Sequence, residues 1–447
     1  MIFDCETRRR PAYSGGMPLA YPIVLSTLEN GLRVVVSEDH SVPAVTVNLW
    51  VDVGSRHEAP GRTGLAHLFE HLMFQGSENV APGEHFELLM AEGGRLNATT
   101  WFDRTNYFET VPTGALDLAL WLEADRQGRL LPALTQENLD TQRSVVKEEK
   151  RQRYDNQPYG TALEDLVSVV FPEGHPYHHP TIGSMEDLDA VTLEVVHDFY
   201  RTHYGPNATV VTLCGDVTPD EGVAAVRRHF DDLPPTAVPS RPPGPQLPPL
   251  GHPVRLDRVG EVPNPRLYVA FRLPVADTRE LAACSVALDA LGGLTISRLH
   301  RRLVRREGLS TGVSASTMAL VDGASVGFVG VDVGEDADPA TVEQVVAEEL
   351  AAFVEDGPTD LELEASLADT ERHWLETLAS PEDRADLISR FTLLHGDAER
   401  INTVLDTVQG LTAADVRDAA RTWLRPESRA TVSYRPGADR QLGEVAV

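Results

Sequence analysis

The sequence predicts an α+β protein built from two homologous α/β domains, each with a mixed or antiparallel sheet and helices on one face of that sheet. Its 447 residues are too many for one ordinary hydrophobic core, and an apolar content of 42% is enough to fill two. Each half begins with stretches in which apolar and polar residues alternate, as in half-buried strands, and continues into stretches with helical apolar spacing. Because these strands and helices do not alternate strictly, a wholly parallel sheet is disfavoured.

A proline-rich segment separates the two halves. The stretch DDLPPTAVPSRPPGPQLPPLGHP, residues 231–253, holds nine prolines, which exclude both a helix and a central strand. We interpret it as an interdomain linker, because each flanking part has the size of an ordinary domain. The sequence therefore predicts an N-terminal domain at 18–232, a linker at 233–253 and a C-terminal domain at 254–445.

The predicted elements follow a similar order in the two halves. Those of the N-terminal half are strands within 32–54 and helices at 64–74, 114–131 and 138–154. Those of the C-terminal half are a strand at 262–275 and helices at 280–293, 297–308, 340–354 and 412–424. This order indicates a duplicated α/β unit, of which only the first copy kept the histidines considered below.

The net charge limits the classes of partner. Lys and Arg number 39 against 68 Asp and Glu, which gives −29 at pH 7 and repels phosphate backbones and anionic lipid headgroups. We therefore expect neither nucleic acid nor a membrane as a partner, whereas a basic peptide would suit the charge. The alternative is that this scattered acidity only keeps the protein soluble.

Cysteine usage and the first residues bear on the compartment. Cys5, Cys214 and Cys284 are odd in number and far apart, so neither a disulfide framework nor a Cys-based zinc site is expected. Residues 1–22 contain no apolar signal-peptide core, and no later run is long enough to span a bilayer. The sequence predicts a cytoplasmic soluble protein.

Two histidines four residues apart mark a candidate metal site in LAHLFEHLMF, residues 65–74. On a helix, His67 and His71 lie on one face, one turn apart, where both imidazoles can reach a single ion. A hydrolytic zinc site uses three protein ligands and a water, so a third donor must come from elsewhere in the chain. Glu70 is close enough to touch that water and has the position of a general base. The alternative is a core helix, which would bury a carboxylate among apolar side chains at a cost.

The His-x-x-Glu-His pattern resembles the inverted zinc motif of the inverzincins, the metallopeptidases of the pitrilysin and mitochondrial processing peptidase type. Further segments between residues 28 and 217 resemble the family in the same order: LENGLRVVV, VGSRHEAPGRTGLAHLFEHLMFQGS, GGRLNATTWFDRTNYFETVP, FPEGHPYHHPTIGS, FYRTHYGPNATVV and GDV. The C-terminal half is similar to the family's second domain through ALGGLTISRLHRRLVRREGLS. The chain thus resembles the zinc-bearing subunit of a bacterial-type processing peptidase.

The resemblance implies a third metal ligand. In the family this ligand is a glutamate on a helix whose counterpart here reads QRSVVKEE, residues 142–149, which places it at Glu149. Glu148 is the alternative ligand, although a solvated helix charge explains it better. Helical spacing puts Glu149 on a stripe that we expect to face inward, together with Gln142, Val145, Val146 and Arg153.

The reaction that the resemblance implies is hydrolysis of peptide bonds. One Zn²⁺ held by His67, His71 and Glu149 would lower the pKa of its water, and Glu70 would take the proton as that water attacks a peptide carbonyl. The expected function is a zinc-dependent endopeptidase that cleaves extended peptides inside a chamber formed by paired halves. A non-catalytic structural subunit and a peptide-binding module are the alternatives, and another divalent metal could replace zinc.

Two loop or strand segments bear on ligand binding. GGRLNATT, residues 93–100, resembles the family's edge strand for an extended peptide, so that Asn97 and Ala98 are candidate substrate-binding residues. The alternative is that these two residues merely continue the sheet. We expect no second metal site in the proline-interrupted loop GHPYHHP, which offers no helical or strand register to bring together His175, His178 and His179.

The sequence departs from the family pattern in two places. Gln142 stands where the family usually carries an acid, which puts in doubt any role near the metal that needs a negative charge. Val304 and Thr311 stand where active single-subunit relatives carry an Arg and a Tyr that engage substrate, and only a shift of register would let Arg305 or Arg306 replace that Arg. The resemblance therefore implies a heterodimer in which a related subunit supplies the Arg/Tyr pair, with a homodimer as the alternative.

Overall fold

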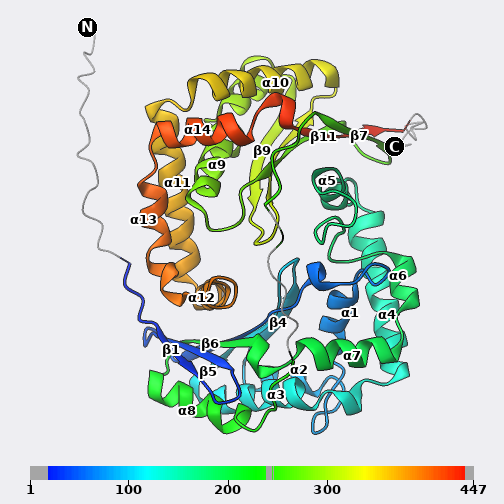
Figure 1. Cartoon of the computed structure of the whole chain (residues 1–447), viewed down its shortest axis with the longest axis vertical. Coiled ribbons are helices and arrows are strands. Elements are labelled where there is room, and N and C mark those ends of the chain that lie inside the picture. Colours follow the sequence, from blue (N-terminus) through cyan, green and yellow to red (C-terminus); the bar gives the residue numbers. More distant parts are fainter. Residues whose placement is uncertain (1–18, 238–243, 245, 438–447) are drawn as a thin grey trace, which may run out of the picture.

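The computed structural model describes residues 19–237, 244 and 246–437, so the ends of both predicted domains and part of the predicted linker, 238–243 and 245, lie outside the described residues. The described chain forms two sheets, one from each half (Figure 1). The first consists of β1 (Val24–Thr27), β2 (Arg33–Glu38), β3 (Ala44–Val51), β4 (Arg95–Thr100), β5 (Thr105–Pro112) and β6 (Thr209–Gly215). The second consists of β7 (Val254–Gly260), β8 (Arg266–Leu273), β9 (Ser310–Met318), β10 (Ser325–Val333) and β11 (Ala430–Pro436).

The two sheets share the order and direction of five strands, and β1 is an additional edge strand of the first. In the first, the order is β1-β2-β6-β3-β5-β4, with β2 and β6 parallel and the pairs from β6 to β4 antiparallel. In the second, the order is β7-β11-β8-β10-β9, with β7 and β11 parallel and the pairs from β11 to β9 antiparallel. The predicted mixed sheets are confirmed, and the shared order identifies β4 and β9 as equivalent edge strands of a duplicated unit.

Helices surround both sheets. Those of the N-terminal half are α1 (Leu65–Leu72), α2 (Glu84–Ala91), α3 (Leu116–Arg129), α4 (Gln136–Lys150), α5 (Ala162–Val170), α6 (Met185–Ala190), α7 (Leu193–His203) and α8 (Pro219–Phe230). Those of the C-terminal half are α9 (Arg279–Leu288), α10 (Pro339–Asp356), α11 (Asp360–Ala379), α12 (Pro381–His395), α13 (Val404–Gln409) and α14 (Ala413–Trp423). None of the described helices is both long enough and apolar enough to cross a lipid bilayer.

Strand alternation assigns each face of the first sheet to a different environment. On β3, Val45, Val47 and Leu49 are fully buried in the core that the helices of the N-terminal half cover. The residues between them point to the opposite face, where Trp50 packs in a separate cluster with Ile388 of α12. A period of two along a strand thus builds two cores, one on each side of the sheet.

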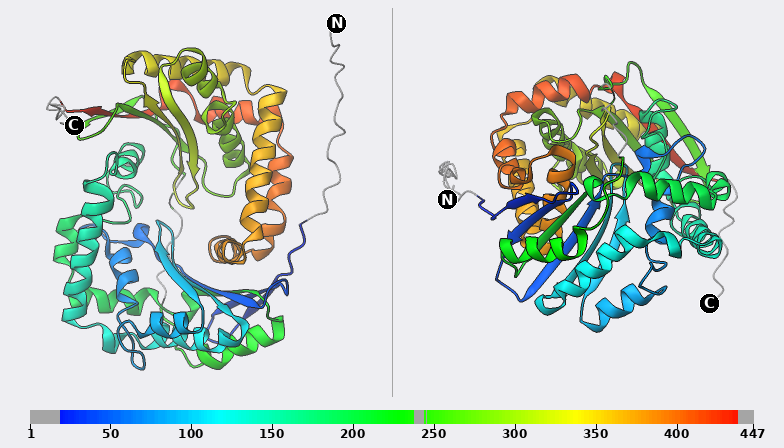
Figure 2. Two further views of the ribbon diagram at one scale, coloured as in Figure 1. Left: turned by 180° about the vertical axis from the view of Figure 1, so that it is seen from behind. Right: turned by 60° about the horizontal axis from the view of Figure 1, so that its bottom comes forward.

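Each half lends a helix to the sheet of the other half. Helix α12, which belongs to the C-terminal half, packs on β3 and β6 of the first sheet, while α5, from the N-terminal half, packs on β7, β8 and β11 of the second. Figures 1 and 2 show α12 reaching down to the first sheet and α5 reaching up to the second. This exchange covers the face of each sheet that its own helices leave open, and it ties the halves together.

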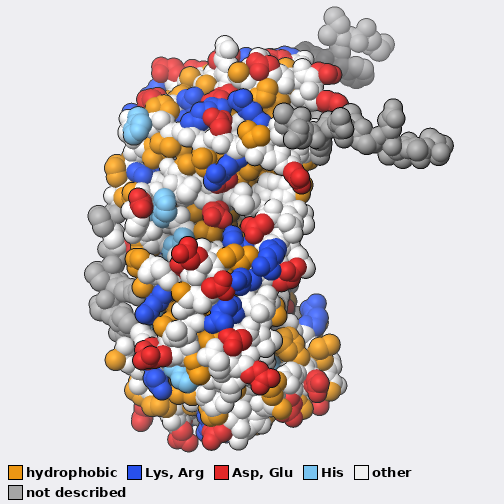
Figure 3. All heavy atoms as spheres, turned by 90° about the vertical axis from the view of Figure 1, so that its right-hand side faces the viewer, with side chains coloured by type: hydrophobic (Ala, Val, Ile, Leu, Met, Phe, Trp, Pro, Cys, Tyr) orange, Lys and Arg blue, Asp and Glu red, His pale blue; other side chains and the backbone are white. Residues whose placement is uncertain are grey.

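Charge on the surface is mixed. On the side of the molecule in Figure 3, acidic and basic side chains lie interspersed and form no large patch of one sign. Many charged side chains of the described residues are paired; Lys147 with Asp189 and Arg255 with Glu343 are examples. The face in Figure 3 shows no acidic stripe, although the chain as a whole carries an excess of acid.

Candidate metal centre

Helix α1 carries the two histidines of the motif. It forms because Leu65, Leu68 and Leu72 fall on one helical face and are buried in the first core. His67 and His71 lie on the other side of the helix, with 14% and 22% of their side chains exposed. The helix therefore anchors itself through one face and offers its imidazoles on the other.

The start of α1 is fixed by two features. Gly64 precedes the helix with φ 88°, in the left-handed region, and a Cβ there would lie 2.7 Å from the carbonyl oxygen of Ile182. The carboxylate of Glu58 accepts hydrogen bonds from the backbone amides of Gly64 at 3.0 Å and Ala66 at 2.8 Å. A buried carboxylate thus satisfies the free amides at the helix N-terminus and fixes the helix axis.

Glu149, near the end of α4, meets the two histidines. Its Oε2 lies 3.4 Å from Nε2 of His71 and 3.8 Å from Nε2 of His67. One ligand atom from each of the three residues lies within 4.8 Å of the other two, and this is the only such group of three or more His, Cys, Asp or Glu side chains within the described part of the chain. The structure therefore brings together the three side chains predicted as ligands.

The donor set fits a zinc ion. Two ligands bound at 2.0–2.1 Å to a tetrahedral zinc lie about 3.3 Å apart, close to the separations between Glu149 and the two imidazoles. Two imidazoles and one carboxylate are ligand types that zinc takes in hydrolytic sites, which leave a fourth position for water. His67, His71 and Glu149 would hold the ion.

The protonation of the imidazoles differs. Burial, together with the charge of His71, lowers the pKa of His67 to about 4, so its imidazole is neutral at pH 7. Burial also acts to lower the pKa of His71, but the hydrogen bond to Glu149 and the charges of Glu70 and Glu149 raise it above the ordinary value. The hydrogen bond with His71 in turn lowers the pKa of Glu149. One imidazole and the carboxylate are thus already in the forms that bind a metal.

Glu70 lies beside the ligands and is held by Thr100. The hydroxyl of Thr100, at the end of β4, donates to Oε2 of Glu70 at 2.5 Å. Glu70 is buried, and burial raises the pKa of its carboxyl, against the effects of Thr100 and of the charges on His71 and Arg104. A carboxylate with a raised pKa and a fixed orientation has the properties of a general base.

Helix α4 differs from the expected inward stripe. Gln142 and Val146 are buried as expected, but Val145 is 44% exposed and the Arg153 side chain is 74% exposed. Val145 lies at the margin of the buried stripe, which Leu139, Gln142, Val146 and Lys150 form. Arg153 is exposed because α4 ends at Lys150 and continues into a π-helical turn, Arg151–Asp155, which rotates the following side chains away from the α-helical register. Arg153 nevertheless donates to Oε1 of Glu149 at 2.7 Å.

The two candidate ligands on α4 have different surroundings. Glu148 is 54% exposed at its side chain and binds only its helical neighbours Arg151 and Gln152. Glu149, with 17% of its side chain exposed, points to the histidines. The geometry favours Glu149 as the third ligand.

A cavity of about 550 Å³ opens over these residues. Its lining includes the three predicted ligands and Glu70, the apolar side chains of Phe74 and Phe86, and four consecutive residues of β4, Asn97–Thr100. Strand β4 pairs with β5 on one side and forms the edge of the sheet. The backbone amide of Ala98 is held by the side chain of Asn97 at 2.9 Å. Both predicted substrate-binding residues therefore line this cavity on an edge strand.

Two contacts of the site, those of Glu58 and Thr100, had little or no signal in the sequence. Glu58 gave a weak signal, since an acid shortly before a helix often binds its first amides. Thr100 gave none, because its contact with Glu70 joins a strand to a helix 30 residues away. Gln142, which stands where the family carries an acid, forms a hydrogen bond with His71 and so does contact a predicted ligand.

The histidines of the GHPYHHP loop have separate partners. His175 stacks on Phe171 with ring centres 4.8 Å apart. His178 lies 2.9 Å from the carbonyl oxygen of Phe171, and His179 lies 2.9 Å from Oε2 of Glu58. The last contact connects this loop to the residue that caps α1.

The C-terminal half has a counterpart of α1 with different chemistry. The segment SRLHRRLVRR, which ends in a π-helix η7 (His300–Arg306), packs beside β9 as α1 packs beside β4. Both Leu299 and Leu303 are fully buried, and aligning them with Leu68 and Leu72 of α1 puts three arginines at the positions of the metal motif. These pairs are Arg298 with His67, Arg301 with Glu70 and Arg302 with His71.

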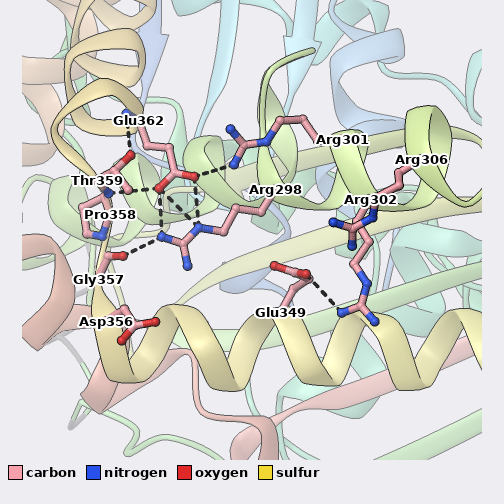
Figure 4. Close-up of a pocket in the computed structure, with 10 residues that line it drawn as sticks. All are labelled: Arg298, Arg301, Arg302, Arg306, Glu349, Asp356, Gly357, Pro358, Thr359 and Glu362. Carbon is pink, nitrogen blue, oxygen red and sulfur yellow. Dashed lines mark hydrogen bonds and ion pairs between the residues drawn. The ribbon is translucent and has the colours of Figure 1, made fainter.

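The arginines line a second cavity, of about 540 Å³, and are held by carboxylates (Figure 4). Arg298 and Arg301 converge on Glu362, with N–O distances of 2.8 and 2.9 Å. Arg302 donates to Glu349 at 3.1 Å. This counterpart is therefore a set of ion pairs and has no metal-binding geometry.

Comparison with known proteins identifies the class. The family described as insulinase (peptidase family M16) matches residues 33–184, and the family described as peptidase M16 inactive domain matches residues 190–368. A protein of Mycobacterium leprae named as an uncharacterized zinc protease is 30% identical over 411 residues, which cover 91% of this chain and 90% of that protein. The chain belongs to the peptidase M16 family, and the family resemblance seen in the sequence is confirmed.

Solved structures agree with the fold. A protease from Helicobacter pylori superimposes with a TM-score of 0.85 at 26% identity and covers 93% of this chain and 100% of that one. The periplasmic protease PqqL from Escherichia coli superimposes with a TM-score of 0.77 at 18% identity, over 94% of this chain but 48% of its own. The second likeness concerns the fold alone, and it shows that one such fold occupies about half of the larger protein.

Proposed function

We propose that this chain is a zinc-dependent endopeptidase subunit that hydrolyses extended peptides. The observation that carries the proposal is the convergence of His67, His71 and Glu149 at 3.4 to 3.8 Å beside the buried Glu70. The fold brings two histidines four residues apart on α1 next to a glutamate of the distant α4, which supports their assignment as ligands, and the name of a relative as a zinc protease supports the choice of metal.

Each residue of the site has a separate task in this proposal. A bound zinc ion would supply a lowered pKa for water and would polarise a peptide carbonyl. The carboxylate of Glu70 accepts the proton of the attacking water and later gives it to the leaving amine, and the raised pKa of Glu70 suits both transfers. Thr100 keeps one oxygen of Glu70 fixed, so that the other faces the cavity for proton transfer.

The substrate is proposed to bind along β4. An extended peptide would add as a further strand to this edge, with its main chain paired to that of Asn97 and Ala98 and displacing the side chain of Asn97 from the Ala98 amide. The apolar walls formed by Phe74 and Phe86 favour an apolar side chain next to the cleaved bond. The net charge of −29 favours peptides with basic residues.

A second chain is proposed to complete the enzyme. At the positions where the family's Arg and Tyr engage substrate, this chain has Val304, half-buried, and Thr311, exposed on β9. We propose a heterodimer with a related subunit that supplies those two side chains, and a homodimer as the alternative. The composition of the complex purified from its own cell, with zinc measured on the same sample, tests the pairing. A fully active single chain contradicts it.

The location is proposed to be cytoplasmic, on the sequence features alone. Immunodetection of the full chain in separated cell fractions tests this proposal. Recovery outside the cytoplasm, together with a shortened N-terminus, would overturn it.

The test of the catalytic proposal is Glu70→Gln. This variant keeps the shape of the side chain and the acceptor for Thr100 but cannot take a proton. We expect hydrolysis of a basic, apolar-containing peptide to fall about 10²- to 10⁴-fold with zinc content unchanged. The matched control, Glu78→Gln, changes a glutamate whose side chain is 57% exposed and should leave the rate unchanged. Equal rates for the wild type and Glu70→Gln would instead favour a structural or peptide-binding role.

A further inference from the structure

The hairpin β4–β5 carries the proposed docking strand and the partner of Glu70, so its position matters for the site. Its turn, residues 101–104, lies against the backbone of 54–56, where the amides of Ser55 and Arg56 donate to Trp101 and Phe102 at 3.1 and 3.0 Å. A Cβ on Gly54 would lie 2.3 Å from the carbonyl oxygen of Trp101. The turn is thus packed tightly at its base.

Arg104 is the last residue of this turn, and its side chain reaches back to β4. Its guanidinium lies over the ring of Trp50 and donates to the carbonyl oxygen and to the hydroxyl of Thr99, at 2.9 and 2.6 Å. The Thr99 hydroxyl in turn donates to Oδ1 of Asn106 on β5, at 2.5 Å. Contacts with Arg104 and Asn106 therefore hold Thr99, the residue next to Thr100, in place.

The network ends on a carboxylate from the C-terminal half. Oδ1 of Asp386, on α12, accepts hydrogen bonds from Nδ2 of Asn106 and from Nε1 of Trp50, each at 2.8 Å. Because Asp386 takes the amide nitrogen of Asn106, the amide oxygen is turned toward Thr99. Asp386 is also the carboxylate whose charge acts most strongly on the buried Arg104.

The other side of the turn is also held by the C-terminal half. The carboxylate of Asp103 binds Arg56 at 3.1 Å and accepts from the backbone amide of Val321, in the β9–β10 connection, at 3.4 Å. The hydroxyl of Tyr177 donates to the Asp103 carboxylate and accepts from the backbone amide of Asp322, the residue after Val321, at 3.1 Å. Two separate parts of the C-terminal half thus contact the β4–β5 hairpin, α12 at Asn106 and the β9–β10 connection at Asp103.

We propose that Asp386 is a positioning residue for the candidate active site, through which the docked C-terminal half holds the β4–β5 hairpin in register with α1. This inference rests on the proposed function for its kinetic consequence, but the coupling itself is a property of the fold. It means that separating α12 from the first sheet loosens both the docking strand and the orientation of Glu70. The C-terminal half then contributes to catalysis although its own counterpart site is made of ion pairs.

The experiment compares Asp386→Ala, Asp386→Asn and Ser389→Ala in the full chain with its natural partner. Alanine removes both hydrogen bonds at 386, whereas asparagine keeps the accepting oxygen. Ser389→Ala is the matched control, because Ser389 lies one turn further on α12 and its hydroxyl binds Thr212 of β6 at 2.8 Å, away from the hairpin. All rates are expressed per bound zinc ion, so that unfolded protein does not count.

We expect kcat of Asp386→Ala to fall about 10- to 100-fold, because small misplacements of reacting groups are costly. Asp386→Asn should recover most of the rate, and Ser389→Ala should match the wild type. Hydrogen exchange of the amides in 95–106 should rise in Asp386→Ala alone. Unchanged exchange there, or an equal loss in Ser389→Ala, overturns the coupling.

Failure of the proposed function would look different. If Glu70→Gln hydrolyses peptides as well as the wild type, the catalytic proposal is wrong, and the exchange measurement still decides whether Asp386 holds the hairpin. If Glu70→Gln is inactive but Asp386→Ala keeps both full rate and full protection of 95–106, the inference about Asp386 is wrong and the catalytic proposal stands.

Discussion

The two halves of the chain use one sheet topology for different ends. In the first half, the helix beside the edge strand β4 presents His67, Glu70 and His71 to a cavity; in the second, the segment beside β9 presents Arg298, Arg301 and Arg302 to another. The apolar residues that anchor the two helices are equivalent and equally buried. The scaffold therefore does not decide the chemistry, since the same position supports a candidate metal site in one half and a group of ion pairs in the other.

What decides is the polar face of the helix and the partner that it meets. Glu149 turns one carboxylate oxygen toward two imidazoles and pairs through the other with Arg153 at 2.7 Å, which leaves the first oxygen for the metal ion that we propose. Glu362 meets two guanidinium groups that already neutralise it. The first arrangement can bind a cation, whereas in the second the charges are already paired and join the arginine segment to α11.

The first arrangement depends most on Glu149. Glu149→Ala removes one of the three proposed ligands, so we expect zinc to be lost on dialysis and hydrolysis to fall more than about 10⁴-fold. Metal content by mass spectrometry and peptide hydrolysis are the measurements. Glu148→Ala, next along the helix and exposed, should keep both zinc and activity. Zinc retained in Glu149→Ala and lost in Glu148→Ala would reverse the assignment.

The sequence was sufficient for one side of the metal centre. Two histidines at a spacing of four with a glutamate between them define a helix face by geometry alone, and α1 has that face. Glu149 required the family resemblance, because a contact between helices 78 positions apart leaves no local pattern. Thr100 and Asp386 left no signal at all, since each acts through side-chain contacts that only the folded chain creates.

The fold was predictable to a similar depth. The alternating and helical patterns, with the likeness of the two halves, were enough for two mixed sheets with helices. The exchange of α5 and α12 was not predictable, because an amphipathic helix has an apolar face but nothing in its spacing says which sheet it covers. The π-helical turns after α4 and at 300–306 were also beyond reach, since their side-chain spacing is close to that of an α-helix.

The next effect concerns the second arrangement. Glu362→Ala leaves the mostly buried Arg298 without its partner and removes the cap on the backbone amide of Thr359. We expect the free energy of unfolding to fall by about 3 kcal/mol, while the rate per folded, zinc-loaded molecule stays unchanged. Urea unfolding and steady-state kinetics on the same preparation measure the two quantities.

A neighbouring carboxylate serves as the control for Glu362. Glu348 binds Arg302 with 47% of its side chain exposed, so Glu348→Ala should leave the free energy of unfolding close to that of the wild type. If both variants lose the same small amount, the second cavity is an ordinary surface feature. If Glu362→Ala lowers the rate per folded molecule, the arginine cluster of the C-terminal half affects catalysis as well as stability.

The last prediction concerns the core behind the candidate metal centre. Glu109 on β5 is buried, neither of its oxygens has a hydrogen-bond partner among the described residues, and burial together with the charge of Glu123 raises the pKa of its carboxyl well above the ordinary value. A carboxyl with a raised pKa in the folded state stabilises the fold fully only below its pKa in the unfolded chain. That contribution is lost as the pH rises through the folded-state pKa.

Glu109→Gln removes this dependence, because an amide stays neutral at every pH. We expect the variant to gain stability over the wild type from pH 5 to pH 8, by at most about 1.4 kcal/mol per pH unit. Urea unfolding at several pH values gives the slope, and Glu335→Gln, at an exposed loop residue, should give none. If the difference in stability between Glu109→Gln and the wild type does not change with pH, Glu109 is kept ionised by Arg126, whose guanidinium lies 4.4 Å from the centre of the Tyr107 ring. The buried cluster behind α1 would then be a permanent ion pair, like those of the C-terminal half.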